Sequence, residues 1–244
     1  MNVLNIKDVT NYVESNIGDF HFRRLENLKK LKLDKIIQRK NPYLYKAKNI
    51  LTSQDFVTSI LDAHLSSQEE GIFGDFLEGL AIFINQIVYN GRKSMVQGID
   101  LEFEKGKIQY IVSIKSGPNW GNSQQIKRMK ENFKTASRTL RTSNSKLHVQ
   151  AVNGCCYGRD KNPDKGDYYK YCGQLFWEFI SGDANLYTKI IEPLGYKAKE
   201  KNDEFQQSYS QLINKITLEF SQNYCIDGII DWARIVQINS SLSP

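Results

Sequence analysis

The stretch that decides the fold is residues 98–116, GIDLEFEKGKIQYIVSIKS, in which two alternating runs of apolar and polar residues flank a turn. Residues 99–103 alternate, Gly106 lies in the turn, and residues 108–114 alternate again, so the stretch predicts a β-hairpin. The second run ends at Lys115, near the buried end of a central strand. Burying an ammonium group is costly unless an anionic group meets it, so this lysine needs a partner.

Composition sets limits on the class of protein. The chain has 244 residues, enough for one large domain or for one domain with a helical appendage, and its net charge of +6 favours polyanionic partners. The four cysteines have no CxxC spacing, which argues against a zinc site or a disulfide framework. No apolar run of about 18 residues and no signal peptide is evident, so we expect a soluble, cytoplasmic protein without a membrane segment.

The rest of the chain predicts helices around a small sheet. Residues 1–50 read as helical and basic, rich in Lys and Arg over 23–48, with Asn41-Pro42 ending the helical stripe. This face either is solvated or meets phosphates or a partner subunit. Further predicted elements are a helix over 53–65 capped by Ser53, a buried helix over 69–89, a helix over 122–142, a strand over 146–158, a charged loop over 159–171, and helices over 173–181, 186–195, 202–224 and 228–240. Together they predict an α/β layer fold.

Three charged residues of this arrangement point to phosphodiester chemistry. Closing the hairpin brings Asp100, at the start of its first strand, beside Lys115, at the end of its second strand. Glu78, a single acid in the apolar middle of the upstream helix, can add a second carboxylate at the same point. Two carboxylates suit Mg²⁺, which lowers the pKa of a bound water, and the lysine steadies that water or the charge developing on phosphate.

The same residues resemble a known family. The pair GIDLEF and VSIKSG resembles the PD-(D/E)XK motif of type II restriction endonucleases, and the surrounding segments EEGIFGDFLEGLAIFI, SIKSGPNWGNSQQIKRM, NGCCYG and LFWEFISG resemble the PmeII-type enzymes, with a fainter similarity to enzymes that cut GG-N-CC-centred sites. The resemblance spans roughly residues 40–240. It implies a restriction-endonuclease-like core, a central mixed β-sheet flanked by helices, and cleavage of double-stranded DNA that depends on Mg²⁺, for which Mn²⁺ substitutes, usually by a homodimer. Asp100 matches the first acid of the motif, and Lys115 matches its lysine.

On this reading the chain has three parts and one departure from the motif. We expect a basic helical arm over 1–50, the PD-(D/E)XK-like catalytic core over 51–182, and a C-terminal helical part over 183–244 that forms one compact unit with the core. The position two before the lysine, normally Asp or Glu, is Ser113, a poor Mg²⁺ ligand. Glu78 is the first candidate to replace it, and Glu102, on the same strand face as Asp100, is the second; a backbone carbonyl is the alternative.

Two segments are candidates for reading DNA. Residues 116–130 carry amide, hydroxyl and basic groups, and Asn and Gln read adenine while Arg reads guanine. The loop 157–171 leaves a central strand and is either a groove-binding element or an ordinary surface loop. Trp120 is either part of the core or a wedge at the cut site, and Ser123 is also a candidate N-cap. The expected DNA-binding residues are Asn119, Trp120, Asn122, Ser123, Gln124, Arg128, Arg159 and Lys161.

Three functions remain open at this point. The first is a type II restriction endonuclease of a restriction-modification system, whose genetic partner is a cognate DNA methyltransferase. The second is a repair or recombination nuclease of the same fold, which would not need a symmetric dimer. The third is a non-catalytic DNA-binding protein in which Asp100 and Lys115 form a structural ion pair, a reading that Ser113 favours and Glu78 opposes.

Overall fold

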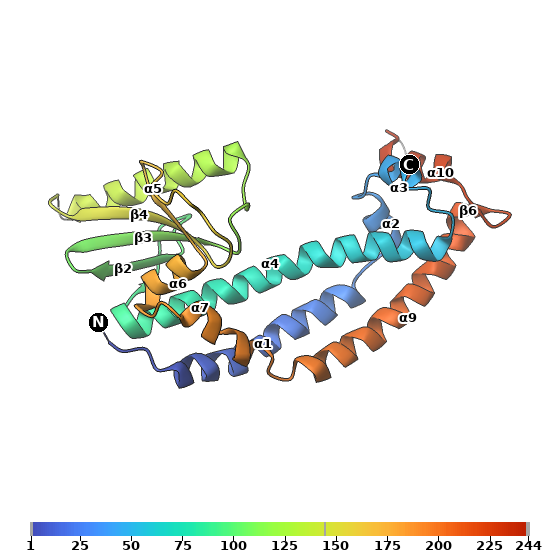
Figure 1. The fold of residues 1–244 in the computed structure, drawn as a ribbon. Coiled ribbons are helices and arrows are strands. Elements are labelled where there is room, and N and C mark those ends of the chain that lie inside the picture. The colour runs from blue at the N-terminus through green and yellow to red at the C-terminus, as the bar shows by residue number, and fades with distance from the viewer. Residues whose placement is uncertain (1, 144, 243–244) are drawn as a thin grey trace. The chain divides into compact units, whose positions relative to one another are not determined.

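The computed structural model describes residues 2–143 and 145–242, and the chain forms two compact units (Figure 1). The first unit contains the residues up to Gly18 together with Phe73–Tyr196, and the second contains Asp19–Ile72 together with the residues from Lys197 onward. The division cuts across the three sequence ranges expected above, because helices α1 (Ile6–Lys29) and α4 (Ser53–Tyr89) each contribute to both units.

The first unit is built on a five-stranded mixed sheet with the order β1-β2-β3-β4-β5. Strands β1 (Arg92–Lys93), β2 (Leu101–Lys105) and β3 (Ile108–Lys115) are antiparallel neighbours. Strands β4 (His148–Cys155) and β5 (Tyr169–Cys172) continue the sheet parallel to β3. The predicted hairpin is therefore present as β2 and β3. Its turn contains Gly106 at a φ of 67°, a conformation that glycine adopts without steric cost.

Helices cover both faces of this sheet. Helix α5 (Ser123–Ser143) makes the crossover that two parallel strands require, and its residues Met129 and Phe133 pack in one buried cluster with Ile111 of β3. Side chains alternate along a strand, so the neighbouring residues of the hairpin face the other way. On that opposite face Phe103 and Tyr110 contact Phe179 of helix α6 (Gln174–Ser181). The short helices α7 (Leu186–Lys189) and α8 (Ile191–Leu194) follow α6.

The second unit is helical. It combines the later part of α1 and the first part of α4 with α2 (Leu33–Ile37), α3 (Pro42–Ala47), α9 (Ala198–Tyr224) and α10 (Trp232–Ser240). A two-stranded ribbon, β6 (Cys225–Ile226) and β7 (Ile229–Ile230), joins α9 to α10. The core of this unit is aromatic: Phe56 contacts Tyr45, Phe220 and Trp232.

Several element boundaries differ from those predicted. The helices expected over 53–65 and 69–89 are one continuous helix, α4, because the polar residues between them include no proline and remain compatible with helix. Its N-cap is Thr52, whose hydroxyl accepts the backbone N–H of Asp55 at 3.0 Å, and not Ser53. Asn41 does not end a helix, because its side chain caps α3 by accepting the backbone N–H groups of Tyr43 and Leu44.

Two further predictions, both in the C-terminal half of the chain, were wrong. The end of the charged segment 159–171 is not loop, because Tyr169–Cys172 pair with β4 as β5. The helix expected over 228–240 begins only at Trp232, because Ile229 and Ile230 belong to β7 and the side chain of Asp231 accepts the backbone N–H of Arg234 as an N-cap.

Helix α4 is long and apolar enough to cross a membrane by length and composition alone, with an 18-residue window of mean hydropathy 1.4. Core helices of proteins pass the same test. In the second unit α4 buries Phe56 and Ile60, and in the first unit it buries Leu80 and Ile84. The helix is therefore weak evidence for a membrane segment.

Candidate active site

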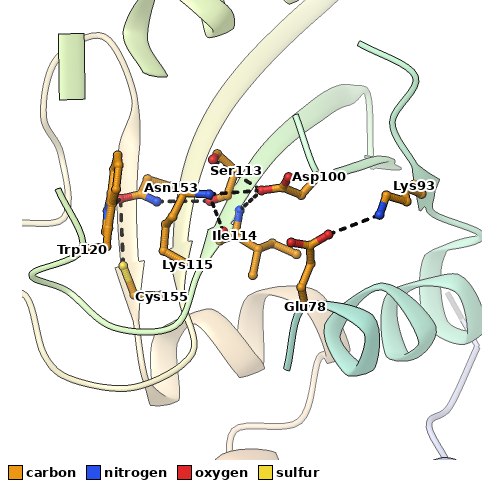
Figure 2. A network of polar contacts seen from close by, with 9 residues as sticks. All are labelled: Glu78, Lys93, Asp100, Ser113, Ile114, Lys115, Trp120, Asn153 and Cys155. Carbon is orange, nitrogen blue, oxygen red and sulfur yellow. Dashed lines mark hydrogen bonds and ion pairs between the residues drawn. The ribbon is translucent and has the colours of Figure 1, made fainter. Parts of the chain in front are cut away.

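Asp100 and Lys115 meet at the open end of the hairpin, opposite its turn (Figure 2). The backbone N–H of Asp100 bonds to the carbonyl of Val112 at 2.8 Å, which fixes the residue beside β3. Its Oδ2 accepts the backbone N–H of Ile114 at 2.6 Å and lies 3.6 Å from the Lys115 Nζ. The lysine also donates to the carbonyl of Ile114 at 2.7 Å. Both charged side chains are partly buried. Asp100 is therefore the anionic partner that we expected for the partly buried Lys115.

Glu78 brings a second carboxylate to the same region from α4. Its Oε1 lies 3.4 Å from the Nζ of Lys93, and burial raises the pKa of Glu78 above its usual value. The negative charge of Asp100 raises this pKa further, while the positive charges of Lys93 and Lys115 lower it. The carboxylates of Glu78 and Asp100, which repel one another, therefore share one region of the first unit with the ammonium groups of Lys93 and Lys115.

The two other candidate metal ligands have different surroundings. Glu102 shares a strand face with Asp100, but its buried carboxylate contacts Arg92 at 3.4 Å and accepts a hydrogen bond from the hydroxyl of Ser94. Ser113 is also buried, and its hydroxyl donates to the Oδ2 of Asp100 at 3.4 Å. Over residues 2–143 and 145–242, no group of three His, Cys, Asp or Glu side chains is arranged to hold a metal ion.

A buried amide, missed in the sequence, connects this centre to the segment after β3. Asn153 of β4 is 1% exposed; its Nδ2 donates to the carbonyl of Ser113 at 3.1 Å, and its Oδ1 accepts the indole N–H of Trp120 at 3.1 Å. The ring of Trp120 in turn lies 5.6 Å from the Nζ of Lys115 (Figure 2). An asparagine inside the apolar run of an interior strand was the available signal, because a buried amide needs hydrogen-bond partners.

The segment 116–130 uses some of its polar groups internally. Asn122 caps α5, because its Oδ1 accepts the backbone N–H groups of Gln124 and Gln125 at 3.0 Å. In turn the Oε1 of Gln125 accepts the backbone N–H of Asn122 at 2.9 Å. The N-cap is therefore Asn122 and not Ser123, which is the first helical residue. Trp120 packs against the cluster between the sheet and α5. The expected DNA-binding residues of this segment that are exposed are Asn119, Asn122, Ser123, Gln124 and Arg128.

The loop that follows β4 packs against the loop that follows β3. The ring of Tyr157 lies where a Cβ on Gly117 would be, and Pro118 lies where a Cβ on Gly158 would be. The Nζ of Lys170 donates to the carbonyl of Pro118 at 2.9 Å. The two loops therefore form one packed surface at the carboxyl ends of β3, β4 and β5.

Arg159 and Lys161 are exposed on this surface, and they flank the partly buried Asp160. Asp160 lies 2.9 Å from the Nζ of Lys165 in its own loop and 3.7 Å from that of Lys170 in β5, so its charge is already neutralised. Arg159 and Lys161 also line a cavity of about 630 Å³. Neither has an ion-pair partner among the described residues, which leaves both cations available to an anionic ligand.

The four cysteines are free thiols, in agreement with the absence of a disulfide framework. Burial, together with the nearby charge of Glu78, raises the pKa of Cys156 to about 12. A thiol in this state is not a nucleophile near neutral pH.

Comparison with known proteins assigns the chain to a family. Residues 7–202 match the family model described as Type II restriction endonuclease EcoO109I. A search of curated proteins found no match. The family match confirms the class of enzyme that the sequence resembles, but it names a different family within that class from the PmeII-type enzymes. Because the match covers most of the chain, the protein belongs to the EcoO109I family of type II restriction endonucleases, which indicates an endonuclease that binds and hydrolyses DNA.

Proposed function

We propose that this protein uses Mg²⁺ to hydrolyse one phosphodiester bond in each strand of DNA at a specific sequence. The observation that carries the proposal is the convergence of Asp100, Lys115 and Glu78 at the end of the hairpin. Two carboxylates and one ammonium group, held by a sheet and a buried helix, suit the binding of a divalent cation next to a phosphate.

The donor set fits a hard divalent cation. No described residue donates a hydrogen bond to the Oδ1 of Asp100 or to the Oε2 of Glu78, so both oxygens are available as ligands. The raised pKa of Glu78 reflects in part its repulsion by Asp100, which a cation between them would relieve. Mn²⁺ accepts the same oxygen ligands and should substitute. When bound, Mg²⁺ would lower the pKa of a water molecule and offset phosphate charge.

The surroundings of the remaining candidates favour Glu78 as the second ligand. The carboxylate of Glu102 is occupied by Arg92 and Ser94, and releasing it would leave the guanidinium without that partner. Ser113 supports Asp100 through its hydroxyl, which suits a positioning role for the serine in place of the usual acid. In this proposal Asp100 and Glu78 bind the metal ion, and Ser113 and Glu102 do not.

Lys115 acts on the reacting phosphate. An ammonium group has three donors, of which one is held by the carbonyl of Ile114 and another points toward Asp100. The third can donate to the attacking water or to a phosphate oxygen. A positive charge held in place before the reaction stabilises the charge that develops on phosphate without further reorganisation.

Sequence reading belongs to the packed surface formed by the loops after β3 and β4. Its exposed polar side chains can reach base edges or phosphates. Trp120 supports this surface through the hydrogen bond of its indole N–H to Asn153, and the Oδ1 of the exposed Asn122 supports it by capping α5. The residues that we propose to contact DNA directly are Asn119, Ser123, Gln124, Arg128, Arg159 and Lys161.

The assembly and biological context follow from the same chemistry. Each chain has one Asp100–Lys115 centre, so a concerted cut of two antiparallel strands needs two chains, and a two-fold homodimer suits a palindromic site. A nuclease of this kind requires a cognate methyltransferase that protects the host DNA. The PmeII-type likeness, a GG-N-CC-like target and the cytoplasmic location remain predictions.

Incubating plasmid DNA with the protein, with and without Mg²⁺, tests the proposal. We expect discrete linear fragments with Mg²⁺ or Mn²⁺ and none after chelation with EDTA. Nicked or branched-DNA products would indicate a repair nuclease of the same fold. Binding without cleavage under every condition with divalent cations would leave only the non-catalytic reading, in which Asp100 and Lys115 are a structural ion pair.

A further inference from the structure

A second basic cavity lies in the helical unit, whereas the proposed catalytic residues belong to the first unit. It has a volume of about 210 Å³, and its lining residues come from α1, α2, the segments that flank α2, and α4. Among the described residues that line it there is no carboxylate, whereas four are cationic: Lys30, Lys32, Lys35 and Arg39. The cavity therefore concentrates positive charge.

These cations are largely unpaired. Lys30 lies 3.8 Å from Glu26 in an exposed contact, which contributes little binding energy. In the described part of the chain, no carboxylate lies within ion-pair distance of Lys32, Lys35 or Arg39. Like charges gathered around one cavity repel one another, and an anion placed among them removes that repulsion.

Two residues on the α4 side of the cavity each carry a polar atom that lacks a partner. The Nε2 of His64 and the Oε1 of Gln68 are buried, and neither has a hydrogen bond. The two residues are four positions apart on one helix, so their side chains lie on the same face. If the oxygen and nitrogen of the Gln68 amide are exchanged, an N–H donor takes the position of this unpaired oxygen. Buried polar atoms are costly when unpaired, so a ligand that accepts hydrogen bonds would satisfy both once the side chains turn toward it, with the imidazole proton of His64 on Nε2.

We propose that this cavity binds a phosphate group, held by the His64 and Gln68 side chains from one side and by Lys32, Lys35 and Arg39 from the other. Phosphate oxygens accept several hydrogen bonds at once, and a guanidinium can donate two of them. A volume of about 210 Å³ accommodates one such group with water around it. The source of the phosphate is the DNA backbone, and this part of the proposal rests on the proposed function.

Histidine NMR can test the site directly, because the chain has three histidines: His21, His64 and His148. Burial, with the positive charges of Lys40 and Arg39, holds the pKa of His64 below its usual value. A phosphate in the cavity adds a negative charge and should raise it. We therefore expect the ring signals and the titration midpoint of His64 to move when the full-length protein binds phosphate, whereas the ring signals of exposed His148 stay at their positions.

Two probes separate the sources of phosphate. One is inorganic phosphate, and the other is duplex DNA in a phosphate-free buffer without Mg²⁺, so that no cleavage occurs. A response of His64 to DNA, with or without a response to inorganic phosphate, supports a backbone contact. A response to inorganic phosphate alone overturns the assignment to DNA and leaves a site for a small phosphorylated ligand. No response to either probe overturns the site.

A pair of double variants tests the contribution of the cavity to DNA binding. Lys35→Ala with Arg39→Ala removes two exposed cations of the cavity, and Lys199→Ala with Lys215→Ala removes two exposed cations of α9 in the same unit. Each neutralised phosphate contributes about 0.9 to the slope of log affinity against log salt. We expect the cavity variant to lower that slope by about 1, with no change in the α9 variant.

Equal slopes in the two double variants would show that the cavity holds no phosphate of the DNA. Binding is measured without cleavage, so this result is independent of the catalytic proposal. A protein that binds DNA through the cavity but never cleaves it would refute the proposed function and leave the phosphate site standing.

Discussion

Replacing Lys115 by Met separates a catalytic lysine from a structural one. Methionine keeps the straight aliphatic stem but removes the charge and the hydrogen bond to the Ile114 carbonyl, which is 2.7 Å long. The ion pair with Asp100 has a separation of 3.6 Å, and its side chains are 31% and 20% exposed, so solvent screens it in part. Its loss should cost about 1 kcal/mol or less, and the lost hydrogen bond about another 1 kcal/mol.

The two contributions predict effects of different size on folding and on rate. A loss of about 2 kcal/mol lowers the melting temperature of a chain of this size by roughly 4–8 °C. Removing one preorganised positive charge from a reacting centre costs about 10²–10³ in rate. Single-turnover cleavage of a cognate duplex at saturating protein should therefore fall at least about 100-fold well below the melting transition, while fluorescence anisotropy with Ca²⁺ shows nearly unchanged DNA binding.

Lys130→Met is the matched control. Lys130 lies 3.3 Å from Asp167 and 5.7 Å from the ring of Tyr168, much as Lys115 lies near Asp100 and Trp120, and its side chain is similarly exposed. At saturation this variant should cleave within about threefold of the unaltered protein, since a screened surface pair is worth less than about 1 kcal/mol. Near-normal cleavage by Lys115→Met, or equal rate losses in both variants, would refute the catalytic assignment of Lys115.

The remaining predictions concern the metal ion, the buried network, packing and assembly. Asp100→Asn should abolish cleavage and weaken Mg²⁺ binding in a calorimetric titration, with Glu78→Gln acting more weakly; full activity of Glu78→Gln would move the second ligand elsewhere. Asn153→Ala leaves the indole N–H of Trp120 unpaired and should cost about 1–3 kcal/mol in urea unfolding, with slower cleavage; unchanged values for both would contradict its positioning role. Gly154→Ala places a Cβ 2.2 Å from the ring of Phe176 and should destabilise by about 1–3 kcal/mol, whereas Gly71→Ala in α4, with open space around it, should stabilise by about 0.5–1 kcal/mol; melting curves that shift in the same direction would count against this packing. Light scattering should give twice the chain mass of 28.2 kDa, and a monomer that cuts both strands in one binding event would contradict the homodimer.

The sequence predicted the hairpin and the Asp100–Lys115 pair because both depend on local rules. Alternation with period two and a glycine turn define the register of β2 and β3, and that register alone brings the two charged residues together. The strand β5 could not be predicted in this way. Its sequence YKYC is short and follows a charged loop, and it becomes a strand only because β4 offers a free edge for parallel pairing.

Tertiary contacts account for the other differences. Trp120 is 33 positions from Asn153, and no local pattern predicts their hydrogen bond. The continuity of α4 was also hidden, since its sequence shows two apolar stretches around a polar stretch, and each stretch is buried in a different unit. Glu78 was recognised as an isolated acid on a buried helix, but only the structure shows its contact with Lys93 and the opposing influences on its pKa.

The packing between the loops after β3 and β4 has a consequence for engineering new target sequences. Tyr157 fills the space above Gly117, Pro118 fills the space above Gly158, and Lys170 is bonded to the Pro118 carbonyl. A loop transplanted from a relative would bring only half of each interlocking pair and would displace the other half, together with the backbone that carries Lys115. Altered specificity is therefore more accessible to libraries that vary both loops jointly, with the two glycines and Pro118 kept constant, than to the exchange of either loop alone.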